Sequence, residues 1–257
     1  MSFFSGTVFS NALLMQTSLR VIIPDNGMQN SKVLYLLHGL SDDSSIWMRK
    51  TCIEQFAEDH DYAVIMPEVN RSFYTDIDCG GKYFTYITKE LPEICERLFG
   101  FRHSREKTFV AGLSMGGYGA LKCALRHPEQ YAACASFSGA VDVQGLLNTG
   151  ESIDVQFPEH GLFFGKDRKL DPSLDLFKLA VEVNKLPTAQ KPRVLTTCGY
   201  QDFLYAYNIG FRDLMNSLDF DYKYIEWEGA HTWPFWNTSI QYALSFFDGH
   251  DLTGTPA

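Results

Sequence analysis

A serine between two glycines is the first feature of the sequence that could carry chemistry. Residues 112–116 read Gly-Leu-Ser-Met-Gly, a G-x-S-x-G pattern centred on Ser114. Glycines at these positions permit a very tight strand-to-helix turn, and the following helix directs its positive N-terminal end toward the serine. The residues before the motif are apolar and those after it are small, which is the setting that the pattern requires. Ser114 is therefore the candidate nucleophile.

A serine hydroxyl needs a base to accept its proton, and the base needs an acid to fix its tautomer. Around a strand–turn–helix serine these groups follow in the order Ser, Asp or Glu, His, each just past a strand end. Downstream of Ser114, only His231 directly follows a predicted strand, at residues 222–227. The other histidines fall at the end of the helix after Ser114, in a loop-rich region and in the polar tail (His127, His160 and His250). His231 is the candidate base.

The acid is expected at a strand end between Ser114 and His231. Asp202 fits this position, because it closely follows the predicted strand 194–198. Asp142 is a competitor, since it follows the predicted strand at 131–138. Glu228 precedes the base by three residues and would have trouble reaching behind its ring. The strand ends favour Asp202 and leave Asp142 open.

Acyl transfer also needs hydrogen-bond donors for the oxyanion of the tetrahedral intermediate. One expected donor is the amide N–H of Met115, the residue after the nucleophile. The second should come from the loop after the predicted strand 32–37, where His38, Gly39 and Leu40 stand. Gly39 allows a tight turn, so the Leu40 amide is the candidate, and His38 is interpreted as a structural hydrogen-bonding residue.

The elements that must position these groups alternate along the chain, which predicts an α/β fold with a mainly parallel sheet and helices on both faces. The first two strands look like an antiparallel lead-in. Strands are predicted at residues 5–10, 18–24, 32–37, 62–67, 107–112, 131–138, 194–198 and 222–227, and helices at 44–59, 83–99, 114–127, 176–183, 204–218 and 233–247. Residues 141–192 interrupt the alternation and form either a cap or lid over the site or a surface connection. We expect one domain over residues 1–257.

Composition narrows the classes of partner. The chain has 257 residues, of which 45% are hydrophobic and 21% are charged, as in ordinary globular proteins. Its net charge of -9 disfavours nucleic acid and anionic membranes as partners. No apolar run reaches the roughly 20 residues that span a bilayer, and the N-terminus does not look like a secretory signal. Six scattered cysteines without a CxxC pair indicate reduced thiols and a cytoplasmic protein, with no metal site or cofactor.

Several segments spread over the whole chain resemble the esterase D family of α/β-hydrolases, most closely the small tributyrin esterases of bacteria. They are YLLHGLSDDSSIW (35–47), YFTYITKELP (83–92), TFVAGLSMGGYGALKCALRHPE (108–129), CGYQDFLY (198–205) and GAHTWPFWN (229–237). The resemblance implies an α/β-hydrolase fold. It places Ser114, Asp202 and His231 at the triad positions and Leu40 and Met115 at the oxyanion positions, and it favours Asp202 over Asp142.

The resemblance further implies a serine esterase that hydrolyses short-chain acyl esters through an acyl-enzyme. The same wider family contains S-formylglutathione hydrolases, feruloyl and acetyl-xylan esterases, and mycolyl transferases. This chain differs from the formylglutathione branch at His38, where that branch usually has serine, and at Leu113, where it has histidine; mycolyl transferases are secreted. A catalytically silent binding module is the alternative outside enzymes.

The expected partner is a small-molecule ester, and relatives often assemble into homo-oligomers. The pocket that would receive the ester is not determined by the sequence. Aromatic residues are candidates for its wall, each of them equally compatible with ordinary packing (Trp47, Tyr200, Trp233 and Trp236).

Overall fold

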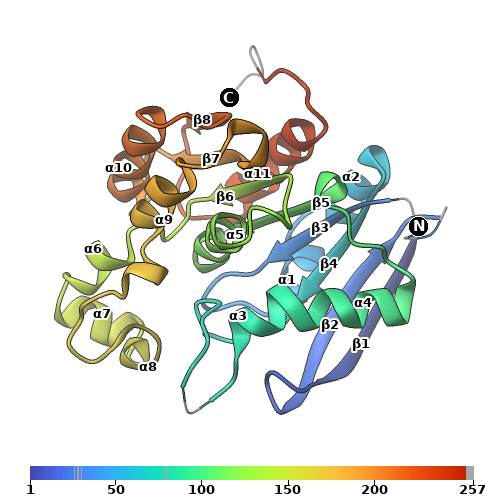
Figure 1. The fold of residues 1–257 in the computed structure, drawn as a ribbon, viewed down its shortest axis with the longest axis horizontal. Helices are drawn as coiled ribbons and strands as arrows, with labels where there is room; N and C mark the ends of the chain where they lie inside the picture. Colours follow the sequence, from blue (N-terminus) through green and yellow to red (C-terminus); the bar gives the residue numbers. More distant parts are fainter. Residues whose placement is uncertain (26, 28, 30, 79, 253–257) are drawn as a thin grey trace.

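The computed structural model describes residues 1–25, 27, 29, 31–78 and 80–252. Its centre is an eight-stranded sheet in the order β1-β2-β4-β3-β5-β6-β7-β8 (Figure 1). The strands are β1 (Ser2–Ser10), β2 (Met15–Ile23), β3 (Lys32–Leu37), β4 (Tyr62–Pro67), β5 (Thr108–Leu113), β6 (Ala133–Phe137), β7 (Arg193–Gly199) and β8 (Tyr222–Trp227). The pairs β1–β2 and β2–β4 are antiparallel, and every other pair is parallel. The predicted α/β-hydrolase fold with its antiparallel lead-in is confirmed.

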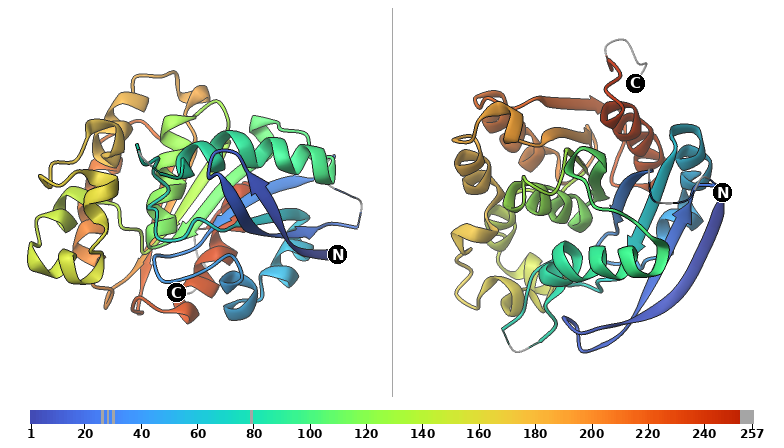
Figure 2. Two further views of the ribbon diagram at one scale, coloured as in Figure 1. Left: turned by 90° about the horizontal axis from the view of Figure 1, so that it is seen from below. Right: turned by 45° about the vertical axis from the view of Figure 1, so that its right-hand side comes forward.

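Helices cover both faces of the sheet (Figure 2). One face packs against α4 (Leu91–Phe99), α5 (Met115–Arg126), α9 (Leu176–Val183) and α10 (Tyr205–Asn216). The opposite face packs against α1 (Ile46–Lys50), α2 (Ile53–His60) and α11 (Trp233–Phe247). Strands buried on both sides explain the nearly continuous apolar runs of β3, β4 and β5. Within the described residues, no helix combines the length and the apolar character that a membrane span needs.

The predicted excursion lies between β6 and β7, at one end of the molecule beside α5 and α10 (Figures 1 and 2). It contains α6 (Val143–Leu147), α7 (Glu151–Gln156), α8 (His160–Phe164), the short 3-10 turns η3 (Pro172–Leu174) and η4 (Thr188–Gln190), and α9. Its Phe157 and Phe164 rings pack on Phe73, at ring-centroid distances of 4.9 and 5.3 Å. The excursion is thus joined to the loop that follows β4, and its role as a lid remains a prediction.

Two predicted helices are interrupted. The one expected at residues 44–59 is split into α1 and α2 because Thr51 is extended and takes over the hydrogen bonds at the break. Its hydroxyl donates to the Trp47 carbonyl at 2.6 Å and accepts the Ile53 amide at 3.2 Å. The helix expected at residues 83–99 consists of α3 (Tyr83–Thr85), a π-helical turn η1 (Tyr86–Glu90) and α4. Pro92 has no amide hydrogen to donate to the preceding turn, and the residues just before it form the π-helical turn η1 instead of a regular α-helical turn.

Candidate active site

Ser114 occupies a backbone conformation that its neighbours enforce. It lies between β5 and α5 with φ 53° and ψ -116°, which a serine rarely adopts. A Cβ at position 112 would lie 2.4 Å from the Gly116 carbonyl oxygen, and one at position 116 would lie 2.5 Å from the Leu37 carbonyl oxygen. Glycine is therefore required on both sides. The Ser114 amide donates to the Phe137 carbonyl at 2.9 Å, which fixes the turn to β6.

The candidate residues come from the carboxyl ends of neighbouring parallel strands, which meet at one edge of the sheet. Ser114 follows β5, Asp202 follows β7 and His231 follows β8. The loop that carries Leu40 follows β3, the neighbour of β5 on the other side. The sheet thus brings residues separated by up to 191 positions, from Leu40 to His231, to the same edge.

His231 and Asp202 form a hydrogen-bonded pair. The ring nitrogen Nδ1 lies 2.9 Å from Asp202 Oδ2 and 3.1 Å from Oδ1, so the ring donates its Nδ1 proton to the carboxylate. The Asp202 side chain is fully buried, and the His231 side chain is 19% exposed. Burial opposes ionisation of Asp202, but the His231 ring and the Leu204 amide outweigh it and lower the pKa of the carboxyl. An ionised Asp202 holds His231 in the tautomer whose Nε2 can accept a proton.

The loops that carry this pair are fastened to each other. The Gln201 amide donates to the Gly229 carbonyl at 2.9 Å, and the Gly229 amide donates to the Gln201 side-chain oxygen at 2.6 Å. Gly199 makes this approach possible, since a Cβ there would lie 2.1 Å from the Gly229 carbonyl oxygen. The Asp202–His231 geometry is consequently set by backbone contacts on both sides.

The relation between His231 and Ser114 is looser. In the described part of the chain no hydrogen bond joins the Ser114 hydroxyl to the His231 ring, and bonds of this kind often tighten only when substrate binds. Two aromatic rings hold the imidazole: Trp236 meets it edge-on at 4.9 Å, and Phe203 packs against it at 4.6 Å between centroids. The Trp236 indole nitrogen donates to the Ser138 hydroxyl at 3.1 Å, which ties the ring to the end of β6.

The competing acids lie elsewhere. Asp142 caps the N-terminus of α6 and accepts the Gly145 amide at 2.7 Å. Glu228 is exposed. The remaining downstream histidines also have other surroundings: His127 pairs with Glu129, His160 pairs with Asp154, and His250 is exposed.

Side chains hold three successive carbonyls where β3 passes into the loop that follows it. The Trp47 indole donates to the Leu37 carbonyl at 3.1 Å, and the Tyr74 hydroxyl donates to the His38 carbonyl at 2.9 Å. His38 Nδ1 donates to the Gly39 carbonyl at 2.8 Å. Among the described residues the Leu40 amide has no hydrogen-bond partner, and the Met115 amide belongs to the first turn of α5, where amides lack intrahelical acceptors.

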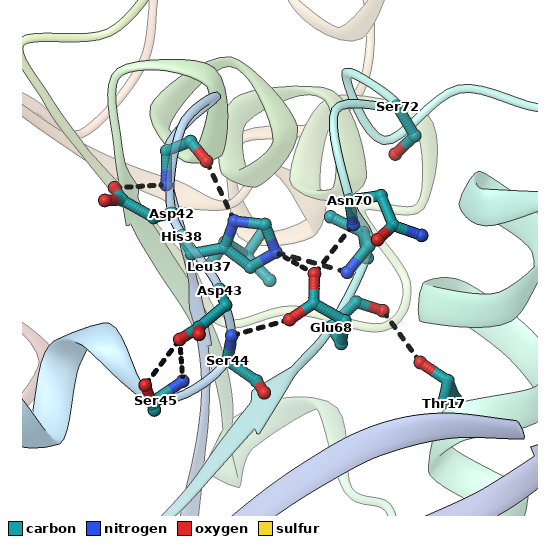
Figure 3. Close-up of polar contacts among 12 residues, drawn as sticks. Thr17, Leu37, His38, Asp42, Asp43, Ser44, Ser45, Glu68, Asn70 and Ser72 are labelled. Atoms are coloured by element: carbon teal, nitrogen blue, oxygen red, sulfur yellow. Dashed lines mark hydrogen bonds and ion pairs between the residues drawn. The ribbon is translucent and has the colours of Figure 1, made fainter.

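A polar network links this loop to the one after β4 (Figure 3). The Glu68 carboxylate accepts the amides of Ser44 at 2.8 Å and Asn70 at 2.9 Å and lies 3.3 Å from His38 Nε2. Although burial opposes its ionisation, the His38 ring and these amides lower the pKa of Glu68 to about 2. The Val69 amide lies 3.1 Å from the same Nε2. This buried histidine has the structural surroundings that the sequence predicted for it.

A cavity of about 710 Å³ opens beside Leu40. Its wall combines carboxylates, one arginine and apolar or aromatic side chains (Asp42, Asp43, Glu68, Glu159, Arg71, Ile77, Tyr83 and Phe163, among others). Ser114 and His231 are not part of that wall, so the cavity adjoins the loop after β3 rather than the serine itself. Of the aromatic candidates, Trp47 and Trp236 are buried in packing, whereas Tyr200 is half exposed.

Sequence reasoning missed several residues that build the site. Phe203 packs against the His231 ring although it is 65% exposed. It directly follows Asp202 in the chain, and this adjacency is the one sequence feature that could have pointed to it. Gln201, Glu68 and Tyr74 act through contacts with distant loops, and no local pattern marks them. Within the described residues, no group of three or more His, Cys, Asp or Glu side chains is arranged to hold a metal ion.

Comparisons with known proteins relate the chain to esterases and serine hydrolases. The chain is 30% identical over 255 residues to an acetyl esterase of Caldicellulosiruptor saccharolyticus, an alignment that covers 93% of this chain and 95% of that protein. The substrate-bound structure of FphF, a fluorophosphonate-binding serine hydrolase of Staphylococcus aureus, matches with a TM-score of 0.85 and 31% identity, over 96% of this chain and 98% of that one. The S-formylglutathione hydrolase FrmB of the same organism matches with a TM-score of 0.80 and 29% identity, over 96% and 98% of the two chains.

The family model described as a putative esterase matches residues 10–247, nearly the whole chain. Together with the α/β-hydrolase fold and the likeness to serine hydrolases, this match identifies the activity class. The chain belongs to the putative esterase family and is a carboxylic ester hydrolase of the esterase D-like α/β-hydrolases.

Proposed function

We propose that the protein hydrolyses short-chain acyl esters by two-step acyl transfer, with Ser114 as nucleophile, His231 as general base and acid, and Asp202 as its partner. The observation that carries the proposal is the buried Asp202 carboxylate hydrogen-bonded to His231 Nδ1, at the sheet edge where Ser114 stands on a strained turn. A paired, oriented imidazole next to a serine on such a turn is the arrangement that activates a hydroxyl.

In the first step His231 Nε2 accepts the Ser114 proton while Ser114 Oγ forms a bond to the ester carbonyl carbon. The tetrahedral intermediate collapses, its bond to the alcohol oxygen breaks, and the proton moves from His231 to the departing alcohol. In the second step water loses a proton to His231 and attacks the acyl-enzyme. The Ser114–acyl bond then breaks, the acid is released, and Ser114 Oγ takes the proton back from His231. The ionised Asp202 stabilises the imidazolium that forms in both steps.

The amides of Leu40 and Met115 supply the oxyanion hole in this proposal. The Met115 amide opens α5, whose N-terminus favours negative charge. The Leu40 amide follows three carbonyls that are held by Trp47, Tyr74 and His38. Donors fixed before the reaction need no reorganisation as charge develops, which is why such donors contribute strongly to the rate.

The substrate is proposed to be an ester with a small acyl group, on the strength of the likeness to the acetyl esterase. The cavity beside Leu40 could receive the rest of the ester. The rings of Tyr83 and Phe163 offer apolar surface in it, and Asp42 and Asn70 offer polar contacts. One methylene changes binding in an apolar pocket by only about 1–3 kcal/mol, so neighbouring chain lengths should differ in kcat/KM by about 10- to 200-fold at most.

The test is a kinetic comparison of wild type, Ser114→Ala and the control Ser217→Ala on p-nitrophenyl esters from acetyl to octanoyl, with S-formylglutathione included. Ser217 lies at the end of α10 and bonds only locally, to the Leu214 carbonyl. We expect Ser114→Ala to lose at least about a thousandfold in kcat, Ser217→Ala to match wild type, and kcat/KM to be highest for the short esters. Retained activity in Ser114→Ala would end the proposal, and a preference for octanoyl or for the thioester would reassign the substrate.

A further inference from the structure

A fully buried lysine stands on the same helix as the candidate nucleophile and has no part in the proposed chemistry. Lys122 lies on α5, two turns after Ser114, and its side chain has no exposed surface. Burying an ammonium group is unfavourable unless its donors are satisfied. Here Nζ donates to Thr75 Oγ1 at 2.7 Å and to the Phe73 carbonyl at 3.3 Å. Both acceptors belong to the loop after β4, which we call the 70–75 turn.

The 70–75 turn has an unusual backbone. Asn70, Phe73 and Tyr74 have φ values of 51°, 49° and 51°, in the left-handed region that bulky residues rarely occupy. Such conformations persist only where surrounding contacts enforce them. The Tyr74 amide donates to Ser72 Oγ at 3.1 Å, and Lys122 binds the two positions on either side of Tyr74. Lys122 thus clamps the part of the turn that presents Tyr74.

Tyr74 connects the 70–75 turn to the oxyanion loop. Its side chain is buried, and its hydroxyl donates to the His38 carbonyl, two residues before Leu40. The ring passes directly over α5, because a Cβ at Gly119 would lie 2.5 Å from the Tyr74 ring. A continuous path of contacts therefore runs from Lys122 through the turn and Tyr74 to the loop that carries the Leu40 amide.

The surroundings of Lys122 offset only part of the cost of burying its ammonium group, and they do not explain why a lysine is needed. Its ammonium faces the rings of Tyr118 and Phe84 at 4.9 and 5.0 Å, which stabilise a cation without a carboxylate partner. Burial nevertheless lowers the pKa of Lys122 to about 7, and among the nearby charges Arg126 adds to this effect while Asp76 opposes it. An apolar side chain of similar length would fill the same space without burying a charge. What lysine adds is the pair of hydrogen bonds to the 70–75 turn.

We propose that Lys122 and Tyr74 are positioning residues for the oxyanion hole: Lys122 fixes the 70–75 turn, and Tyr74 transmits this constraint to the His38–Leu40 backbone. The inference rests on the proposed function, because it concerns the donor that Leu40 would offer to the ester. Neither residue touches the reacting atoms. Their effect is on the placement of the Leu40 amide, and it should appear in the transition state rather than in substrate binding.

The test compares Lys122→Met, Tyr74→Phe and the double variant with wild type and with the control Lys185→Met, which removes an exposed lysine. Removing an oxyanion donor lowers kcat by about 10²–10³, so displacing one should cost about tenfold. We expect each single variant to lose about tenfold in kcat and in kcat/KM with an unchanged KM, while Lys185→Met matches wild type. Because both residues act along one path, the double variant should lose about tenfold as well, and not a hundredfold.

A second measurement separates positioning from general destabilisation. The rate at which a fluorophosphonate modifies Ser114 also depends on donors to the developing oxyanion, so it should fall by the same factor in Lys122→Met and Tyr74→Phe at a temperature where each variant is fully folded. Should Lys122→Met fail to fold, Tyr74→Phe, which removes one hydroxyl, carries both measurements. Single variants that behave like Lys185→Met, or a double variant with multiplied losses, would overturn the inference while Ser114→Ala remains inactive. An active Ser114→Ala would instead remove the proposed function and this inference together.

Discussion

Gly116 contacts the backbone that leads into residues 38–40, the proposed oxyanion loop, and the distances there give a quantitative prediction. In Gly116→Ala the new Cβ would lie 2.5 Å from the Leu37 carbonyl oxygen and 2.7 Å from that of His38. Heavy atoms that are not bonded meet at about 3.5 Å, so the helix and the loop must separate by about 1 Å. Both opposing atoms are backbone, and neither can rotate away. The displacement falls on the segment that leads to the Leu40 amide.

The expected effect is larger on catalysis than on stability. Overpacking costs roughly 1–3 kcal/mol, and the better helix propensity of alanine offsets up to about 1 kcal/mol of it. A net loss of roughly 1–2 kcal/mol corresponds to a decrease in Tm of roughly 2–8 °C in a domain of this size. A misplacement of about 1 Å near the chemistry can cost about a hundredfold in rate. We therefore expect kcat to fall about a hundredfold at temperatures where the variant is fully folded.

The matched control is Gly210→Ala. Gly210 also lies in a helix, α10, but a Cβ there would have no neighbour within 4 Å. This variant should keep the wild-type kcat and gain up to about 1 kcal/mol of stability. The assay is hydrolysis of a p-nitrophenyl ester, combined with thermal unfolding followed by circular dichroism. A Gly116→Ala protein with the kcat and Tm of Gly210→Ala would refute the close approach of α5 to the oxyanion loop.

Two further predictions follow from buried ionisable groups. Asp202→Asn should lower kcat about 10³–10⁴-fold, because the amide can hold His231 in the wrong tautomer. Asp142→Asn should change kcat little. If steady-state kinetics gave the opposite order, the role of the acid would pass to Asp142. Burial lowers the pKa of Lys122 from its usual 10.5 to about 7, so between these pH values the unfolded chain binds a proton that the folded chain does not. Wild type should therefore become more stable relative to Lys122→Met as the pH rises from 7 to 10.5, by on the order of 5 kcal/mol. Urea unfolding of both proteins across this range measures the difference, and a constant difference would contradict the lowered pKa of Lys122.

The sequence allowed the sheet and the placement of the candidate residues to be predicted, for a physical reason. Strands covered on both faces form short, nearly continuous apolar runs, and these runs are visible in β3, β4 and β5. The carboxyl ends of parallel strands share one edge, so the residues after these runs were expected near each other. The structure brings Asp202 and His231 into contact at that edge.

Features that depend on distant contacts were not predictable in this way. Lys122 stands in a helix of mostly small and apolar residues, and its own type suggests a side chain that reaches solvent. It is buried by the 70–75 turn and by the Phe84 ring, which come from other parts of the chain. Tyr74 and Gln201 are defined by the carbonyl or amide that they meet on another loop. Breaks in helices, such as the one at Thr51, depend on a single side chain that replaces backbone hydrogen bonds.

Labelling with a fluorophosphonate tests the assignment of the nucleophile most directly. The reagent is added to wild type, Ser114→Ala and Ser217→Ala, and the modified peptide is located by mass spectrometry while ester hydrolysis is followed. We predict one adduct per chain, on Ser114, with activity lost in proportion to labelling and no adduct in Ser114→Ala. An adduct on another residue, or hydrolysis that persists after complete labelling of Ser114, would contradict the account.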